Sequence, residues 1–89
     1  MAYYVYILEC VDSSFFTGIT TSLADRLGKH NAGKVAEYTA NRLPVTLVYS
    51  EEYTSRTQAQ QAENAIHRMT HEEKRSMIRR LRISGRHQR

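Results

Sequence analysis

The sequence is poor in the residues that would build a disulfide-linked or membrane-bound scaffold. Cys10 is the only cysteine among the 89 residues, so the chain cannot form an intramolecular disulfide or a cysteine zinc cluster. No apolar run reaches the length of about 18 to 20 residues that a membrane-spanning helix needs, and the N-terminus lacks the pattern of a signal peptide. We therefore expect a cytoplasmic protein, in which Cys10 is a small apolar group in a strand.

Internal repeats and low-complexity segments are also missing, which argues against a repeat architecture or a flexible linker. With 40% hydrophobic and 25% charged residues, the composition is typical of a globular protein. The length predicts a single domain, which we place at residues 1–82. Residues 83–89 are polar and basic and contain a glycine, so we expect a flexible C-terminal tail there.

Charge is distributed unevenly along the chain. Residues 1–54 carry four basic and six acidic side chains, a net charge of −2, whereas residues 55–89 carry nine basic and three acidic ones, a net charge of +6. A basic surface attracts phosphate groups and favours nucleic-acid binding that weakens as the salt concentration rises. A solvated helix face explains the same charge without any partner, so charge alone leaves both interpretations open.

Hydrophobic patterns predict three strands. Residues 3–10 are aromatic or β-branched on both faces, as in a buried strand. Turn-forming residues 12–14 separate it from a second short strand at residues 15–19, so the two should form an antiparallel hairpin. A third strand, either central or at an edge, is expected at residues 45–50. The polar and irregular residues 34–44 are expected to form a loop.

Capping signals and helical spacing predict three helices. Ser22 precedes a helix at residues 23–32, which Gly33 should end. Two capping boxes start the other helices: Ser55 with Gln58, and Thr70 with Glu73. Their apolar faces are formed by Ala59, Ala62, Ile66 and Met69 and by Met77, Ile78 and Leu81. The order of elements indicates an α+β domain, in which helices cover a small sheet that contains the antiparallel hairpin.

One helical pair has chemical interest before any comparison is made. Arg26 and His30 lie one turn apart on the first helix, so both side chains can point at one ligand. A histidine in this position is more often a surface or capping residue. Its titration near neutral pH also suits a proton carrier.

Two short motifs in the hairpin are more specific. Tyr4-Val5-Tyr6 and Phe16-Thr17-Gly18 stand where GIY-YIG proteins carry their two signatures. The segments FTGITTSLADRLGKHNAGK, RLPVTLVYSEEY and QAENAIHRMTHEEK follow in the order found in small single-domain bacterial members of that family. The chain therefore resembles a stand-alone GIY-YIG domain over residues 3–78. This resemblance implies a small three-stranded antiparallel sheet flanked by helices.

The resemblance also implies a set of site residues. The GIY tyrosine corresponds to Tyr6, the YIG glycine to Gly18, the helix arginine to Arg26 and the metal-binding glutamate to Glu63. Active relatives hydrolyse phosphodiester bonds with a divalent cation, so we expect one Mg²⁺ or Mn²⁺ bound by Glu63. The expected catalytic residues are Tyr6, Arg26, His30 and Glu63, and the expected substrate-binding residues are Gly18, Lys34, Tyr38 and Arg42.

These residue types suit phosphodiester hydrolysis for physical reasons. A single carboxylate such as Glu63 can hold a Mg²⁺ ion that keeps its other waters and takes a substrate phosphate as ligand. Arg26 can bind that phosphate as a planar donor that is always charged. Tyr6 can hydrogen-bond the attacking water or the phosphate. Taken singly, each has an ordinary explanation as an exposed charge or a core tyrosine, so the joint pattern carries the inference.

Phe16 departs from the family pattern, because it occupies the position of the YIG tyrosine. A phenyl ring has no ionisable hydroxyl and cannot accept a proton, and loss of a general base typically costs about 10² to 10⁴-fold in rate. Tyr6 or His30 could take over that role. Otherwise the protein would be a weak nuclease or would bind DNA without cutting it.

Three functions are consistent with these observations. The leading hypothesis is a metal-dependent DNA endonuclease in DNA repair or processing, general or selective for branched or damaged DNA, acting as a monomer or a weak homodimer. The second is a nucleic-acid-binding module that has lost hydrolysis at Phe16. The third is a protein-interaction domain, whose basic tail docks an acidic partner.

Overall fold

The computed structural model describes residues 2–87, and the side chains of these as far as residue 81. This part of the chain forms three strands and four helices: β1 (Tyr3–Glu9), β2 (Phe15–Thr20), α1 (Leu23–Asn31), α2 (Glu37–Ala40), β3 (Thr46–Tyr53), α3 (Arg56–His67) and α4 (His71–His87). The strand order is β2-β1-β3, and both pairings are antiparallel. The predicted α+β architecture with a three-stranded antiparallel sheet is confirmed, and β3 lies at an edge.

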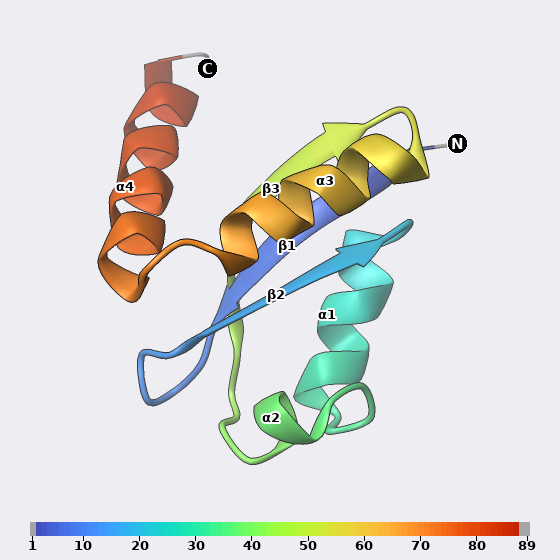
Figure 1. Cartoon of the computed structure of the whole chain (residues 1–89). Coiled ribbons are helices and arrows are strands. Elements are labelled where there is room, and N and C mark those ends of the chain that lie inside the picture. The colour runs from blue at the N-terminus through green and yellow to red at the C-terminus, as the bar shows by residue number, and fades with distance from the viewer. Residues whose placement is uncertain (1, 88–89) are drawn as a thin grey trace.

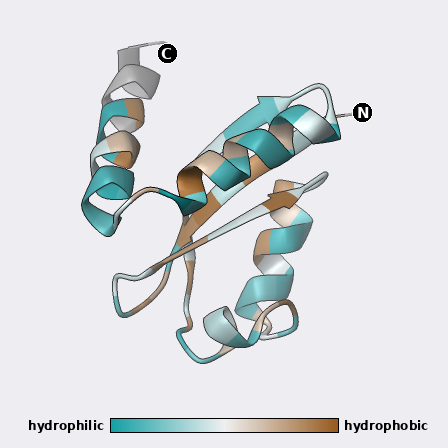
Figure 2. Ribbon diagram, in the orientation of Figure 1, coloured by the Kyte–Doolittle hydropathy of each residue, from teal (hydrophilic) through white to brown (hydrophobic). Residues whose placement is uncertain are grey.

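The central strand β1 is buried because both faces of the sheet are covered. On one face Val5 and Ile7 pack with residues of β3, α3 and α4, among them Tyr49, Ala59, Ile66 and Ile78. On the other face Tyr6 and Leu8 form a second cluster, on which Leu23 and Leu27 of α1 pack. Figure 1 shows α3 running along the sheet and α1 and α2 together on the other side of it. In Figure 2 the visible part of β1 includes strongly hydrophobic residues, whereas the start of α4 is hydrophilic.

The local capping signals are largely confirmed. Ser55 accepts a hydrogen bond of 3.1 Å from the backbone of Gln58 at the start of α3. Thr70 and Glu73 exchange two bonds of 2.8 and 3.1 Å before α4, the reciprocal pattern of a capping box. Ser22 does occupy the N-cap of α1, but its side chain makes no capping bond. Gly33 follows α1 with a φ of 74°, which a residue without Cβ adopts at little cost.

Two expectations need correction. The segment 34–44 is not entirely loop, because Glu37–Ala40 form α2, a helix too short to show a hydrophobic period. Leu81 does not belong to the core face of α4, because its side chain is 45% exposed, although Ile78 one turn earlier is buried.

Helix α4 extends further than the sequence indicates. Its backbone is helical to His87, and so enters the segment 83–89, for which a flexible tail is expected. Residues 88 and 89 lie outside the described residues. No helix in the described part of the chain is long and apolar enough to cross a membrane.

Thr17 provides a test of the packing. Its side chain on β2 is buried, and no described residue bonds its hydroxyl oxygen. We expect Thr17→Val, which replaces the hydroxyl with a methyl group of similar size, to raise the free energy of unfolding by about 1 kcal/mol. Thr20→Val is the matched control, because it removes a hydroxyl that bonds the backbone of Ser22 and should therefore destabilise. Urea unfolding measures the stability of both variants. A destabilised Thr17→Val variant would contradict the conclusion that the hydroxyl of Thr17 has no hydrogen-bond partner among the described residues.

Candidate active site

The position of Tyr6 depends on Gly18. The two residues are direct cross-strand partners in the β1–β2 pairing. A Cβ atom at position 18 would lie 2.6 Å from the Oη atom and 2.7 Å from the Cζ atom of Tyr6. Side chains do not approach each other this closely, so only glycine lets the phenol ring lie across β2. The space beside Gly18, which was predicted to bind substrate, is filled by the ring of Tyr6.

Tyr6 begins a chain of hydrogen bonds that joins β1, α1 and α2. Its Oη atom lies 3.0 Å from Nε2 of His30, and Nδ1 of His30 lies 2.9 Å from the Oγ1 atom of Thr39. Thr39 donates to the carbonyl of Ala36 at 3.1 Å. His30 and Thr39 are both 0% exposed. His30 is therefore neither a surface nor a capping histidine, and it faces the tyrosine rather than solvent.

The surroundings keep both members of the Tyr6–His30 pair neutral at pH 7. Burial raises the pKa of Tyr6 above its ordinary value; the charge of Arg26 opposes this rise, and the charge of Glu63 adds to it. Burial also lowers the pKa of His30, and the positive charge of Arg26 acts in the same direction. Arg26 on α1 and Glu63 on α3 therefore lie within electrostatic reach of Tyr6. All four predicted catalytic residues gather at one place in the fold.

The carboxylate of Glu63 has the surroundings that a ligand of one divalent cation needs. Its side chain is only 18% exposed, with one oxygen 3.5 Å from Nε2 of His67. The other oxygen accepts a bond of 2.8 Å from Gln60. In the described part of the chain, no three His, Cys, Asp or Glu side chains gather as a metal site. One carboxylate fits a Mg²⁺ or Mn²⁺ ion whose remaining ligands are water and phosphate oxygens.

Phe16 packs directly on this site. Its ring centroid lies 5.0 Å from that of His30 and 6.5 Å from that of Tyr6. It also stacks on the ring of Tyr38, at 6.4 Å. Phe16 thus covers the Tyr6–His30 pair with an apolar ring, at a position where the family pattern has a hydroxyl.

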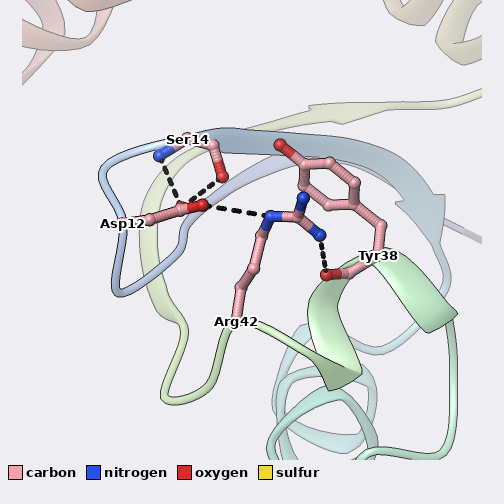
Figure 3. A network of polar contacts seen from close by, with 4 residues as sticks. All are labelled: Asp12, Ser14, Tyr38 and Arg42. Atoms are coloured by element: carbon pink, nitrogen blue, oxygen red, sulfur yellow. Dashed lines mark hydrogen bonds and ion pairs between the residues drawn. The ribbon is translucent and has the colours of Figure 1, made fainter.

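The predicted substrate-binding residues beyond Gly18 lie near α2. Arg42 donates to Asp12 at 3.0 Å and to the carbonyl of Tyr38 at 2.9 Å, and its guanidinium lies 3.9 Å from the centre of the Tyr38 ring. Figure 3 shows this network, in which Asp12 also binds Ser14 of the β1–β2 turn. These contacts tie the turn to α2 and explain the position of Arg42 without a substrate. Lys34 is exposed between α1 and α2.

Helix α4 carries a basic surface of its own, apart from Lys34 and Arg42 near α2. Arg75, Arg79 and Arg80 are exposed along it. His71 stacks on Phe15 at 4.6 Å between ring centroids, and the guanidinium of Arg75 lies 5.8 Å from the same ring. Phe15 points to the face of the sheet opposite to Phe16, because successive strand residues alternate. Arg75, His71 and Phe15 together offer charge and flat rings, which suit a nucleic-acid backbone and its bases.

Comparisons with known proteins agree with these features. A family model described as the GIY-YIG catalytic domain matches residues 2–76. The chain is 49% identical over 75 residues to a UPF0213 protein of Streptococcus sanguinis, covering 84% of this chain and 86% of that protein. It resembles the solution NMR structure of the UPF0213 protein of Bacillus halodurans, with a TM-score of 0.58, 38% identity and coverage of 88% and 83% of the two chains. It also resembles the solution NMR structure of a protein from E. faecalis, with a TM-score of 0.64 and 34% identity. That match covers 93% of this chain and 88% of the other.

Proposed function

This chain belongs to the GIY-YIG family, and we propose that it is a metal-dependent endonuclease that hydrolyses phosphodiester bonds of DNA. Family membership points to a nuclease-type hydrolase that acts on nucleic acid. The observation that carries the proposal is the buried Tyr6–His30 pair, because it lies within electrostatic reach of a basic and an acidic side chain. A proton acceptor, a phosphate-binding cation and a carboxylate are the groups that this hydrolysis needs.

Tyr6 and His30 are proposed to activate the attacking water. The Tyr6 Oη atom lies within hydrogen-bond distance of His30 Nε2, so it can pass its proton to the imidazole while it takes one from water. The low pKa of His30 keeps the imidazole neutral at pH 7 and ready to accept that proton. Phe16 packs on the imidazole, but its ring has no group that can take part in proton transfer.

Arg26 and Glu63 are proposed to handle the charge of the phosphate. Arg26 donates to the non-bridging oxygens with a fixed planar geometry, and its interaction grows as negative charge develops in the transition state. Glu63 would hold the divalent cation, Mg²⁺ or Mn²⁺, which when bound offsets negative charge on the phosphate and the leaving oxygen. The bond from Gln60 and the contact with His67 hold the carboxylate of Glu63 in its present orientation.

DNA is the proposed partner, and its backbone should also contact residues outside the proposed catalytic group. We propose that Lys34, Tyr38 and Arg42 contact it on the α2 side, together with the exposed arginines of α4. Such side chains would bind phosphates or stack on bases. They therefore favour recognition of DNA shape, such as branched or damaged sites, over reading of sequence. We further propose a role in DNA repair or processing in the cytoplasm, with the protein acting as a monomer or weak homodimer.

The proposal is tested with labelled DNA of several structures. Branched, nicked, single-stranded and linear duplex DNA are incubated with the protein and Mg²⁺, Mn²⁺ or EDTA. We expect cleavage with metal, none with EDTA, and the fastest cleavage of branched or nicked substrates. Failure to cut any of the four substrates with either metal, by a protein that is folded, would contradict it.

Phe16 favours a second function, that of a nucleic-acid-binding module that does not hydrolyse DNA. That function predicts an inert wild type whose salt-sensitive DNA binding survives Glu63→Gln, and a gain of cleavage in Phe16→Tyr. If the protein is instead an endonuclease that uses Tyr6 and His30, the wild type is already active. Phe16→Tyr should then change the rate of DNA cleavage only slightly. The same gel assay distinguishes the two results.

A further inference from the structure

We propose that Thr39 is a positioning residue that fixes His30 in the tautomer with hydrogen on Nδ1. Nε2 of His30 is then a bare acceptor for the proton of Tyr6, and the pair replaces the hydroxyl that is missing at Phe16. This inference rests on the proposed function only for its consequence in catalysis, because the tautomer itself is a property of the free protein. The segment that holds Thr39 is one in which the sequence indicates a loop.

Placement of the hydrogen atoms supports this tautomer. Thr39 has one hydroxyl hydrogen, and the carbonyl of Ala36 lies 3.1 Å from its oxygen in donor geometry. With that hydrogen used, the oxygen of Thr39 can only accept from Nδ1–H of His30, at 2.9 Å. A neutral imidazole then has no hydrogen on Nε2, which accepts from the hydroxyl of Tyr6 at 3.0 Å. All three hydrogens have an acceptor in this arrangement.

The opposite tautomer leaves a group unsatisfied. If Thr39 donated to Nδ1, Nε2–H would donate to Tyr6, and the phenol hydrogen would have no acceptor recorded within the described residues. An unpaired buried donor is unfavourable, since it loses its hydrogen bonds to water without replacement. The carbonyl of Ala36 does not decide between the two, because it also accepts from the backbone of Ala40.

The surroundings hold Thr39 in place for this role. Its side chain is completely buried, and it lies in α2, whose end is fixed by the contacts of Arg42 with Tyr38 and Asp12. Phe16 packs edge-on against the imidazole and contacts Tyr38 as well. The imidazole therefore has little freedom to rotate, so the bond to Thr39 determines which nitrogen carries the hydrogen.

The chemical step that follows is balanced in atoms and protons. The water oxygen forms a bond to phosphorus as the bond from phosphorus to the leaving sugar oxygen breaks. One water proton moves to Oη of Tyr6 as the phenol proton moves to Nε2 of His30. The leaving oxygen takes a proton from solvent, and after the product leaves, the proton on Nε2 returns through Oη of Tyr6 to a new water molecule. In the wrong tautomer Nε2 already carries a hydrogen, so Tyr6 has no acceptor and this step is blocked.

The first test is made on the free protein. Nitrogen NMR of the His30 ring distinguishes a nitrogen with hydrogen from one without, and we expect hydrogen on Nδ1 in the wild type. Thr39→Val keeps the shape of the side chain but removes the acceptor, and should shift the ring towards the Nε2–H tautomer. Thr39→Ser should preserve the wild-type pattern. A wild type with hydrogen on Nε2, or a ring unchanged by Thr39→Val, would overturn the proposal.

The second test uses the cleavage assay under single-turnover conditions. Thr39→Val should lose about 10² to 10⁴-fold in the rate of cleavage, with little change in DNA affinity, because the effect is on proton transfer. Thr39→Ser should recover most of the rate, and Thr46→Val, an exposed threonine of β3, is the matched control. Equal loss in the serine variant would indicate a packing role instead. If the wild type does not cut DNA, the proposed function fails, while the NMR result still decides the role of Thr39.

Discussion

Replacing Tyr6 by phenylalanine should lower the rate of DNA cleavage by about 10² to 10⁴-fold, the usual cost of removing a general base. The ring and its packing across Gly18 are retained, so DNA affinity should stay close to that of the wild type. Only the hydroxyl that faces His30 is lost. The measurement is the single-turnover rate at saturating protein, together with the dissociation constant for an uncut substrate.

Tyr4→Phe is the matched control, because Tyr4 lies on the same strand and its side chain is only half-buried. The control should cut DNA at nearly the wild-type rate. The free energy of unfolding of the Tyr6→Phe variant should also fall by about 1 kcal/mol, since His30 loses a buried hydrogen-bond partner. A Tyr6→Phe variant that cuts as fast as the wild type would remove Tyr6 from the mechanism.

The second large effect is expected at Gly18. In Gly18→Ala the new Cβ would lie 2.6 Å from Oη of Tyr6, so the ring must move away from β2 and from His30. We expect a loss of cleavage as large as that of Tyr6→Phe. Stability should also fall by about 1 to 3 kcal/mol, the usual cost of forcing a methyl group into packed space. The single-turnover rate and urea unfolding measure the two effects.

Gly28 offers the control for that experiment. A Cβ there meets no atom within 4 Å, and Gly28 lies within α1, where alanine is the better helix former. Gly28→Ala should therefore be as active as the wild type and more stable by about 0.5 to 1 kcal/mol. Full activity in a folded Gly18→Ala variant would show that the ring position seen here is not required.

The parts of the fold that could be predicted from sequence are those set by local chemistry. The hairpin was predictable because turn residues separate two strongly apolar runs, and its register places Tyr6 opposite Gly18. The starts of α3 and α4 were predictable because a serine or threonine at the N-cap bonds a backbone group only three residues away. The gathering of the proposed catalytic residues followed from the family resemblance, not from their spacing.

The remaining features depend on contacts between distant segments. The spacing of Arg26 and His30 shows that they share a helix face, but not that this face packs on Tyr6 and buries the imidazole. Thr39 carries no sequence signal, because its role depends on a short helix that brings its hydroxyl to His30. The exposure of Leu81 depends on where α4 leaves the sheet, which periodicity does not reveal.

The most direct test of a metal-dependent endonuclease is cleavage of branched DNA with Mg²⁺ by the wild type and by Glu63→Gln. Glutamine keeps the size of the side chain and can still bond Gln60, but it loses the charge that would hold the cation. Glu72→Gln, an exposed glutamate of α4, is the control. We predict cleavage by the wild type and by Glu72→Gln, and a loss of at least about 10²-fold in Glu63→Gln. Equal cleavage by all three proteins, or cleavage that persists in EDTA, would contradict the proposed function.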